Sequence, residues 1–374
     1  MKTRKAKFAV SVLAVGGILA VIVLVVLSLP PFGGTVSGER LKLVQANPQY
    51  QDGAFVNVEP QTPYSLSEVG GMFSEQFFYD EIRIPPSKIP VVRISPASLE
   101  PLSDSTLRAF WIGHASVFVE IDGVRILIDP VFSDYASPFD VGPKRFHPPP
   151  IPLHDLPKID AVVISHDHYD HLDMKTIMYL ATQGTQFLVP LGVGAHLEVW
   201  DVPENQIQEL GWWQDRMVGG VKIICTPTRH YSGRGLTDNK ATLWSSWTVI
   251  GSQHRFYYSG DTGYSKHFKE IGERFGPFDI SFIKIGAYGP GASWLDIHMT
   301  PEDAVRAHKE VQAKRLFPVH WGTFNLAFHD WDEPIKRVLQ VANQEEIDLV
   351  TPRVGEIVFS NREFHSENWW ESVH

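Results

Sequence analysis

Hydrophobic and polar residues follow three different patterns along the 374-residue chain. Residues 8–29 form an apolar run without a charge. Residues 35–106 are polar, rich in proline and glycine, and show no regular period. From Leu107 onward, short apolar runs of strand length alternate with segments of helical period. The pattern predicts three regions, which are a transmembrane helix with its flank (1–34), a linker and N-terminal extension lying on the domain (35–75), and one large domain (76–374).

Strands and helices are expected where these periods change. Strands are predicted at residues 108–112, 116–121, 124–129, 161–164, 187–189, 221–225, 243–250, 255–258, 280–285 and 315–319. Helices are predicted at residues 173–183, 300–311 and 334–343. The second of these helices has Thr300 as its N-cap and Pro301 in its first turn. Strand-rich halves separated by helices favour two sheets packed face to face with helices outside.

The apolar run at residues 8–29 follows four basic residues within residues 1–7. At ~1.5 Å per residue, a helix of this length crosses a hydrocarbon core ~30 Å thick. We predict an uncleaved signal anchor, and a cleaved signal peptide or a buried core helix are the alternatives. A basic flank stays in the cytoplasm. The predicted protein is therefore single-pass and membrane-anchored, with its large domain on the non-cytoplasmic side, periplasmic or extracellular.

Composition excludes several classes of function. Beyond residue 34 the chain carries 29 basic and 43 acidic residues, which argues against a nucleic-acid-binding face. The single cysteine, Cys225, excludes an intrachain disulfide and a multi-cysteine zinc site. Cys225 lies in a predicted strand, where we expect it to pack in the core.

The 16 histidines include a cluster with the spacing of metal ligands. Residues 165–171 read Ser-His-Asp-His-Tyr-Asp-His and directly follow a predicted buried strand. Imidazole and carboxylate groups are the ligands that suit zinc and similar metals. Three further candidates, His230, Asp261 and His320, stand at or just beyond the ends of later predicted strands. Together with His166, His168, Asp170 and His171 they make seven candidate ligands, which suits two metal ions sharing one carboxylate.

The pattern His-x-His-x-Asp-His followed by His, Asp and His resembles that of the metallo-β-lactamase superfamily. Within it, the chain is most similar to the family of N-acyl-phosphatidylethanolamine-hydrolysing phospholipases D. The similarity extends over roughly residues 75–345, well beyond the metal motif. The segments that carry it are residues 111–116, 129–130, 142–146, 164–171, 239–247, 260–264, 274–279, 285–288 and 320–324.

This resemblance implies a fold, a cofactor and a ligand assignment. The fold would be a four-layer αβ/βα sandwich with the metals at one edge between two sheets. The cofactor would be two Zn²⁺ ions or other divalent metals. His166, His168 and His230 would hold one ion, while Asp170, His171 and His320 would hold the other. Asp261 would bridge the two ions, and the family resemblance also implies a homodimer.

Charge counting then favours an anionic substrate. Two Zn²⁺ ions bring four positive charges, of which Asp170, Asp261 and one hydroxide remove three. The remaining positive charge suits a phosphodiester, whose transition state is held by electrostatics and positioning. We expect a hydroxide shared by both metals to attack phosphorus of N-acyl-phosphatidylethanolamine or a related phospholipid. The products would be phosphatidic acid and N-acylethanolamine, and Asp170 counts as a catalytic candidate as well as a ligand.

Other residues are expected to assist this centre. The family has a histidine where this chain has His298, which would stabilise charge or donate a proton to the leaving alkoxide, unless it is a surface residue. The preceding residue is Ile297, whereas the family often has glutamine there. Tyr169, the third catalytic candidate, either touches a phosphate oxygen or packs. His114 and Asp129 are expected to orient metal ligands from behind.

Other functions on this fold stay open. A lactonase, a β-lactamase or a soluble phosphodiesterase would use the same metals. A non-catalytic metal-binding protein is a further alternative, although it would not need an open site of two metals. A lipid substrate would also give tryptophans near the site a role at a membrane interface. The candidates for that role are Trp212, Trp213, Trp244, Trp247 and Trp294.

Overall fold

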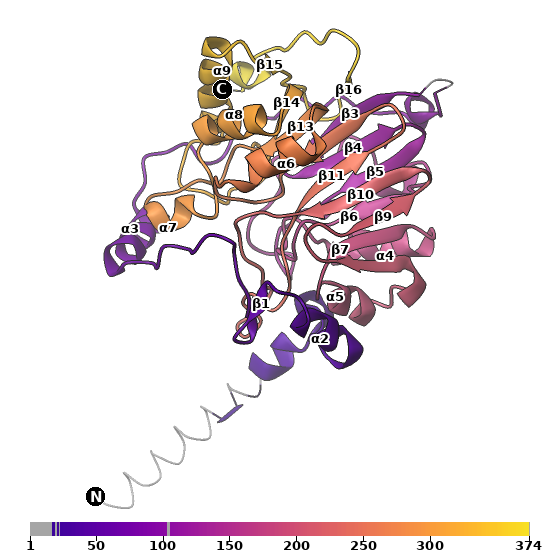
Figure 1. Cartoon of the computed structure of the whole chain (residues 1–374). Helices are drawn as coiled ribbons and strands as arrows, with labels where there is room; N and C mark the ends of the chain where they lie inside the picture. Colours follow the sequence, from indigo (N-terminus) through magenta and orange to yellow (C-terminus); the bar gives the residue numbers. More distant parts are fainter. Residues whose placement is uncertain (1–16, 19–20, 22, 103–104, 374) are drawn as a thin grey trace, which may run out of the picture.

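A computed structural model describes residues 17–18, 21, 23–102 and 105–373 of the chain. Two seven-stranded sheets form its centre (Figure 1). The first sheet has the strand order β16-β3-β4-β5-β6-β7-β8. Its strands are β3 (Leu107–Gly113), β4 (Ser116–Ile121), β5 (Val124–Ile128), β6 (Ala161–Val163), β7 (Gln186–Pro190), β8 (Ile207–Leu210) and β16 (Ile357–Phe359).

The second sheet has the order β15-β14-β13-β12-β11-β10-β9. Its strands are β9 (Asp215–Val218), β10 (Val221–Thr226), β11 (Ser246–Ile250), β12 (Arg255–Tyr258), β13 (Phe278–Lys284), β14 (Ala313–Val319) and β15 (Asp348–Leu349). Each sheet joins an antiparallel part to a parallel part, and the parallel strands are β5 to β8 in the first sheet and β12 to β15 in the second.

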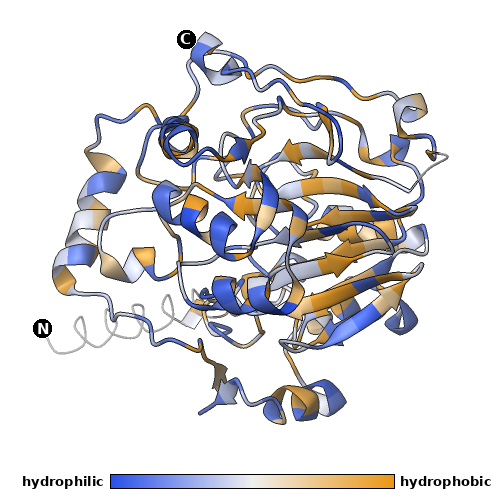
Figure 2. Ribbon diagram, turned by 45° about the horizontal axis from the view of Figure 1, so that its top comes forward, coloured by the Kyte–Doolittle hydropathy of each residue, from blue (hydrophilic) through white to orange (hydrophobic). Residues whose placement is uncertain are grey.

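Helices cover the outer faces of both sheets (Figure 1). The first sheet carries α4 (Met174–Thr182) and α5 (Gly194–Val199). The second carries α6 (His267–Phe275), α8 (Pro301–Glu310) and α9 (Glu333–Gln344), while the short α7 (Ala292–Leu295) precedes α8. Figure 2 shows apolar colour concentrated on the strands and mixed colour on the helices, as expected when helices bury only one side. These layers confirm the predicted αβ/βα sandwich.

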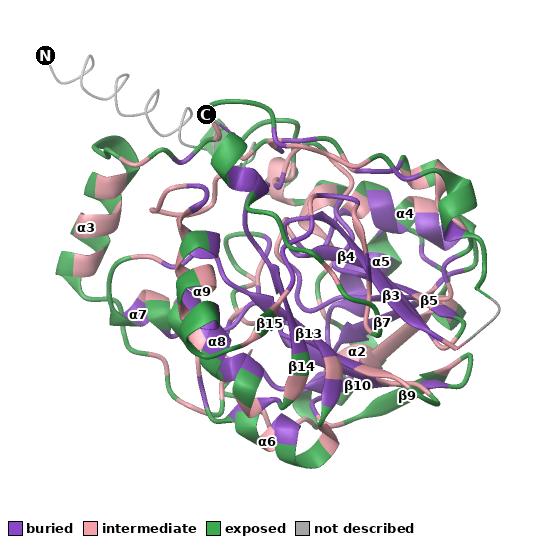
Figure 3. Cartoon of the chain, turned by 90° about the horizontal axis from the view of Figure 1, so that it is seen from above, coloured by how far each residue is buried: buried purple, intermediate pink, exposed green. Residues whose placement is uncertain are grey.

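Alternation along β3 explains why the core lies on both sides of the first sheet. Leu107, Ala109 and Trp111 join the cluster between the two sheets. Phe110 and Ile112 point the other way, into the cluster under α4 and α5. A strand buried on both faces reads as a continuous apolar run. Strands β3 and β4 are accordingly buried along their whole length and purple when the chain is seen from above (Figure 3).

The predicted transmembrane run at residues 8–29 lies largely outside the described residues. Residues 17–18, 21 and 23–27 are helical. Within the described part of the chain, no helix has the length and apolar character needed to cross a membrane.

Residues 35–75 are more ordered than a linker. They contain α2 (Gly38–Gln45), a small hairpin of β1 (Tyr50–Gln51) and β2 (Ala54–Phe55), and most of α3 (Leu66–Phe77). Arg40 of α2 forms ion pairs of 2.5 Å with Glu198 of α5 and with Glu209 of β8, which both belong to the layer of the first sheet. These elements therefore lie on the domain as an N-terminal extension.

Candidate metal centre

The candidate ligands converge because they follow strands that end at the same edge. The parallel strands β5 and β6 lead into Asp129 and the histidine cluster, while β12 and β14 lead into Asp261 and His320. Parallel strands present their carboxyl ends at one edge of a sheet. Since the two sheets pack face to face, these edges meet. His230 reaches the same place from the loop after β10.

Several backbone positions at this edge are strained. His114, Asp129 and His320 adopt positive φ values of 52°, 41° and 65°. Non-glycine residues in this region are uncommon, and they cluster at functional sites. Gly260, directly before Asp261, has φ +57° and no room for a side chain, because a Cβ there would lie 2.6 Å from the Ser245 carbonyl oxygen. The backbone is thus held in sparsely populated conformations at these four positions beside the candidate ligands.

Three histidines form the first half of the centre. The Nε2 atom of His166 lies 2.8 Å from Nδ1 of His168, and Nε2 of His230 lies 3.4 Å from the same atom. The other nitrogen of His230 contacts the Ile297 carbonyl oxygen at 3.1 Å. A histidine that uses one nitrogen on a carbonyl keeps the other for a metal. Ile297 therefore contributes a backbone carbonyl at the position where the family often has glutamine.

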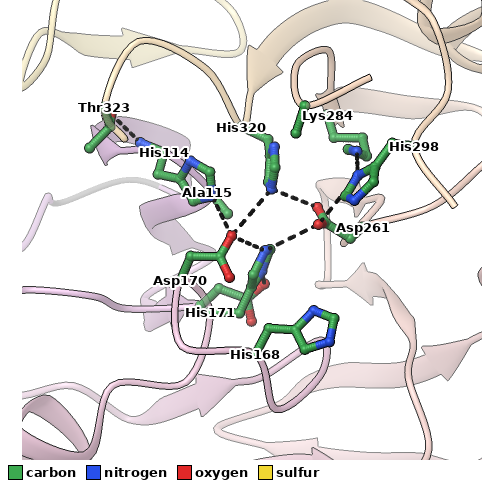
Figure 4. A network of polar contacts seen from close by, with 12 residues as sticks. His114, Ala115, His168, Asp170, His171, Asp261, Lys284, His298, His320 and Thr323 are labelled. Carbon is green, nitrogen blue, oxygen red and sulfur yellow. Dashed lines mark hydrogen bonds and ion pairs between the residues drawn. The ribbon is translucent and has the colours of Figure 1, made fainter. Parts of the chain in front are cut away.

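The second half contains Asp170, His171 and His320 (Figure 4). Oδ2 of Asp170 lies 3.4 Å from Nε2 of His171 and 3.6 Å from Nε2 of His320. Asp261 stands between the halves. Its Oδ2 lies 3.5 Å from Nε2 of His171 and 3.9 Å from Nε2 of His230, and its Oδ1 lies 3.0 Å from Nε2 of His320. All seven predicted ligands are brought together.

The donor atoms at this centre fit divalent metal ions. Nε2 of His171, Nε2 of His320 and Oδ1 of Asp261 are buried, and none of them forms a well-oriented hydrogen bond with a described residue, although the last two lie 3.0 Å apart. Buried polar atoms without partners cost folding free energy unless something else binds them. Imidazole and carboxylate groups are the ligands of zinc and of other borderline divalent ions. The unpartnered atoms and the donor set thus agree with a metal centre.

The protonation states also suit metal binding. Burial lowers the pKa of His166 and of His230 well below the usual value, so both rings are neutral. Burial alone would raise the pKa of Asp261, but the neighbouring His320 and Lys284 hold it well below its usual range. Burial would lower the pKa of His171, yet the surrounding carboxylates raise it well above the usual value. A metal ion binding at Nε2 of His171 would therefore displace a proton.

Asp129 and His114 lie directly behind the ligands, as expected. Oδ2 of Asp129 lies 2.7 Å from Nδ1 of His171 and also accepts hydrogen bonds from the hydroxyls of Ser165 and Tyr258. Nε2 of His114 lies 2.8 Å from Oδ2 of Asp170. Such contacts orient a ligand and set which of its atoms faces the metal.

His298 faces the centre from the turn between α7 and α8. Its ring centroid lies 5.1 Å from that of His230 and 5.9 Å from that of His320. Its Nδ1 lies 3.7 Å from Oδ2 of Asp261 and in close contact with the Nζ atom of Lys284 (Figure 4). His298 is therefore an integral part of the site and not a surface residue.

Tyr169 lies away from this centre. Its hydroxyl donates a hydrogen bond of 2.8 Å to the Arg234 carbonyl oxygen, and the Arg234 guanidinium lies 4.0 Å from the ring centroid. Of the two alternatives, the structure therefore favours packing, and Tyr169 receives no role in catalysis below.

Most of the tryptophans proposed for a membrane interface are buried instead. Trp212, Trp244 and Trp247 belong to the core between the sheets. Trp247 donates a hydrogen bond of 3.0 Å to the Ile164 carbonyl oxygen, directly before the histidine cluster. The interfacial role is wrong for these three, whereas Trp213 and Trp294 are half-buried. Cys225 is buried in the same core, as predicted.

Two features of the site were not expected from the sequence. Asn57 and Gln61 of the N-terminal extension donate hydrogen bonds to the His230 carbonyl oxygen at 2.8 and 3.3 Å. Lys284 ends β13 with its side chain fully buried. The sequence signal for this burial is that Lys284 stands between the apolar residues Ile283 and Ile285.

Comparisons with known proteins agree with this geometry. A family model described as a beta-lactamase superfamily domain matches residues 124–321. An uncharacterized protein of Mycobacterium tuberculosis is 46% identical over 342 residues, covering 87% of this chain and 88% of that protein. The N-acyl-phosphatidylethanolamine-hydrolyzing phospholipase D 1 of Caenorhabditis elegans is 39% identical over 287 residues, covering 72% and 80% respectively.

Among solved structures, an isothiocyanate hydrolase from Delia radicum gut bacteria has the same fold. The superposition has a TM-score of 0.54 at 19% sequence identity, and it covers 67% of this chain and 98% of the hydrolase chain. At that identity, the likeness concerns the fold alone. The sandwich, the ligand cluster and the family match together show that this chain is a metal-dependent hydrolase of the metallo-β-lactamase superfamily.

Proposed function

We propose that the protein is a zinc-dependent phosphodiesterase of the phospholipase D type, which hydrolyses N-acyl-phosphatidylethanolamine or a related phospholipid to phosphatidic acid and N-acylethanolamine. The observation that carries this proposal is the cluster of seven ligands in a chain that is 39% identical to a phospholipase D of that specificity. When bound, two divalent ions here supply an acidified water and positive charge for the reacting phosphate.

The charges of the chain's own residues support an anionic substrate. Asp170 and Asp261 are the carboxylates among the seven ligands, so two divalent ions would leave the centre positive. Lys284 adds a further buried positive charge behind His298. An anionic phosphodiester is attracted to such a site, whereas a neutral lactone gains much less.

His298 is the residue that would act on the substrate directly. It lies beside Asp261 but is not one of the seven ligands. Its side chain is 12% exposed, so a part of the ring stays accessible. In this proposal it donates a hydrogen bond to the oxygen that leaves phosphorus, where negative charge develops.

Apolar surface beside the site supports a substrate that resides in a membrane. Helix α3 has no buried residue, and Leu66, Phe73 and Phe77 on it are 92%, 67% and 63% exposed (Figure 3). Its Glu68 accepts hydrogen bonds from Ser293 of α7, the helix that leads to His298. A surface of this kind marks contact with a partner or a membrane.

We further propose that the apolar residues 8–29 hold the domain at a bilayer, on its non-cytoplasmic side. Ile18, Val21, Leu24 and Val25 are exposed apolar residues of the described part of this segment. Tethering would raise the effective concentration of a lipid substrate at the site. The homodimer implied by the family resemblance stays a prediction.

The test is product identification in water labelled with oxygen-18. Metal-loaded protein is incubated with N-acyl-phosphatidylethanolamine in H₂¹⁸O, and the lipids are analysed by mass spectrometry. Attack on phosphorus breaks the bond between phosphorus and the N-acylethanolamine oxygen. The ¹⁸O atom should therefore appear in phosphatidic acid and be absent from N-acylethanolamine.

Two variants control this experiment. His171→Ala removes a ligand and should abolish turnover. His154→Ala removes a histidine whose side chain is 73% exposed and should leave turnover unchanged. No phosphatidic acid from a preparation that holds two metal ions per chain would contradict the phospholipid assignment, while leaving the superfamily membership intact.

A further inference from the structure

Lys284 is a buried positive charge whose Nζ atom forms no direct ion pair with a carboxylate of the described residues. Its side chain is fully buried at the end of β13, at the edge where the ligands converge. Among the described residues, no carboxylate oxygen lies within 4.0 Å of its Nζ atom, and the nitrogen's contact is Nδ1 of His298. An unpaired charge in the interior lowers the stability of the folded state. A residue retained at such a cost is a candidate for function.

The contact with His298 decides where the proton of that ring resides. A lysine ammonium has only hydrogen-bond donors, so Nδ1 of His298 must accept. A neutral ring whose Nδ1 accepts carries its proton on Nε2. The competing partner is Asp261, whose Oδ2 lies 3.7 Å from Nδ1, beyond hydrogen-bond distance. Without Lys284, Nδ1 would be free to carry the proton and point it at that carboxylate.

The remaining nitrogen of His298 is free for a ligand. Within the described part of the chain, no residue forms a hydrogen bond with Nε2 of His298, although the ring lies among His230, His320 and Trp294. The Trp294 ring, at 5.8 Å between centroids, restricts the orientation of the imidazole. Nε2–H is thus a fixed donor beside the metal ligands.

Charge balance does not account for Lys284. With two divalent ions bound, Asp170 and Asp261 would already be neutralised, and a further cation would be repelled. An anionic substrate changes this balance, because its phosphate is attracted by both the metals and the lysine. The positive charge of Lys284 is therefore electrostatically favourable mainly when an anionic substrate is bound.

We propose that Lys284 is a positioning residue that holds His298 with its proton on Nε2, so that His298 donates a hydrogen bond to an oxygen of the substrate phosphate. This inference rests on the proposed function for the identity of the substrate. Lys284 is too buried to touch the substrate itself, so it acts through His298.

Two substitutions test this role in the full-length, zinc-loaded protein. Lys284→Met keeps the length of the side chain but removes the charge and the donor. Lys284→Gln removes the charge and keeps an amide donor for Nδ1. Because the unpaired charge is lost, both variants should melt at the same temperature as the wild type or higher, and both should keep two zinc ions. A residue with a purely structural role would instead lower the melting temperature.

Activity and ring protonation are then measured separately. We expect kcat for N-acyl-phosphatidylethanolamine to fall about 10-fold or more in Lys284→Met with little change in KM, and to recover partly in Lys284→Gln. Nitrogen-15 spectra of labelled histidines, assigned through His298→Asn, should show a proton on Nε2 of His298 in the wild type and in Lys284→Gln. In Lys284→Met the proton should move at least partly to Nδ1.

Unchanged kcat or an unchanged His298 signal in Lys284→Met would overturn the proposal, as would a lower melting temperature accompanied by loss of zinc. If the wild type does not hydrolyse the lipid at all, the proposed function fails. The role of Lys284 is then tested by the histidine spectra and not by turnover. In that case inorganic phosphate serves as the probe, and its affinity for the zinc-loaded protein should be several-fold weaker in Lys284→Met than in Lys284→Gln.

Discussion

Replacing Asp129 by asparagine should weaken metal binding without touching a ligand. Oδ1 of Asp129 accepts a hydrogen bond of 2.6 Å from the Ser165 backbone, and an amide oxygen can keep that bond. The other carboxylate oxygen would become an NH₂ group, which cannot accept from Nδ1–H of His171. The hydroxyls of Ser165 and Tyr258 can rotate, but the imidazole must move its proton to Nε2. Nε2 is the atom that faces Asp170 and Asp261, so the ring would lose its lone pair for the metal.

The magnitude follows from the contacts that Asp129 makes. Changing a group that orients a metal ligand typically costs 10–100-fold in metal affinity, or about 1.4–2.8 kcal/mol. Loss of hydrogen bonds to a buried charged group should also lower the free energy of unfolding of the metal-free protein by about 1.5–3 kcal/mol. Metal affinity is measured by zinc titration against a competing chelator, and stability by urea denaturation of metal-free protein.

Asp173→Asn is the matched control. Asp173 is also a buried carboxylate, and it accepts hydrogen bonds from Ser133 and Thr176 and caps α4, but it contacts no candidate ligand. This variant should lose stability to a similar degree and keep its zinc affinity. If Asp129→Asn binds two zinc ions as tightly as the wild type, the reasoning about His171 is refuted.

Three further predictions follow from buried side chains. Tyr169→Phe should leave kcat within about twofold and lower the unfolding free energy by about 1 kcal/mol, because only the bond to Arg234 is lost; a large fall in kcat would restore a catalytic role. Burial raises the pKa of Cys225, so a thiol reagent should label it only after unfolding, and labelling of native protein would contradict the core placement. Burial also lowers the pKa of three histidines that contact no candidate ligand to about 3 or 4. The unfolded chain therefore binds protons on these rings below pH 6.5 while the folded chain does not, and the free energy of unfolding should fall by about 1.4 kcal/mol per pH unit for each ring. Melting temperatures that do not change between pH 7 and 5 would refute this. These residues are His147, His267 and His308.

Much of the fold could be predicted from local patterns. Strand β4 occupies residues 116–121 as expected, because an apolar run before the Asp122-Gly123 turn leaves few alternatives. Helix α8 begins at Pro301 after the Thr300 cap, as expected. Elements without such signals were missed. Helix α6 has no side-chain cap at Lys266, and the edge strand β9 is exposed and polar. Helix α3 has a capping box at Ser65, but Gly70 and Gly71 favoured a loop.

The candidate ligands can be predicted where they lie close together in the sequence or directly follow a predicted strand. The spacing of the histidines and aspartates from His166 to His171 predicts a metal site by itself. The contact of Lys284 with His298 depends on how β13 packs against the turn before α8, which no local pattern encodes. The support that Asn57 gives to His230 likewise depends on a segment 173 residues away folding back onto the domain.

We propose that the seven candidate ligands hold two metal ions and that phosphodiester hydrolysis needs both of them. The most direct measurement adds zinc stepwise to metal-free protein while metal content and release of phosphatidic acid from N-acyl-phosphatidylethanolamine are followed together. Turnover should appear only as the second ion binds, and His320→Ala should stop at one ion without turnover. Full turnover with one ion or none, or no turnover with two, would contradict the account.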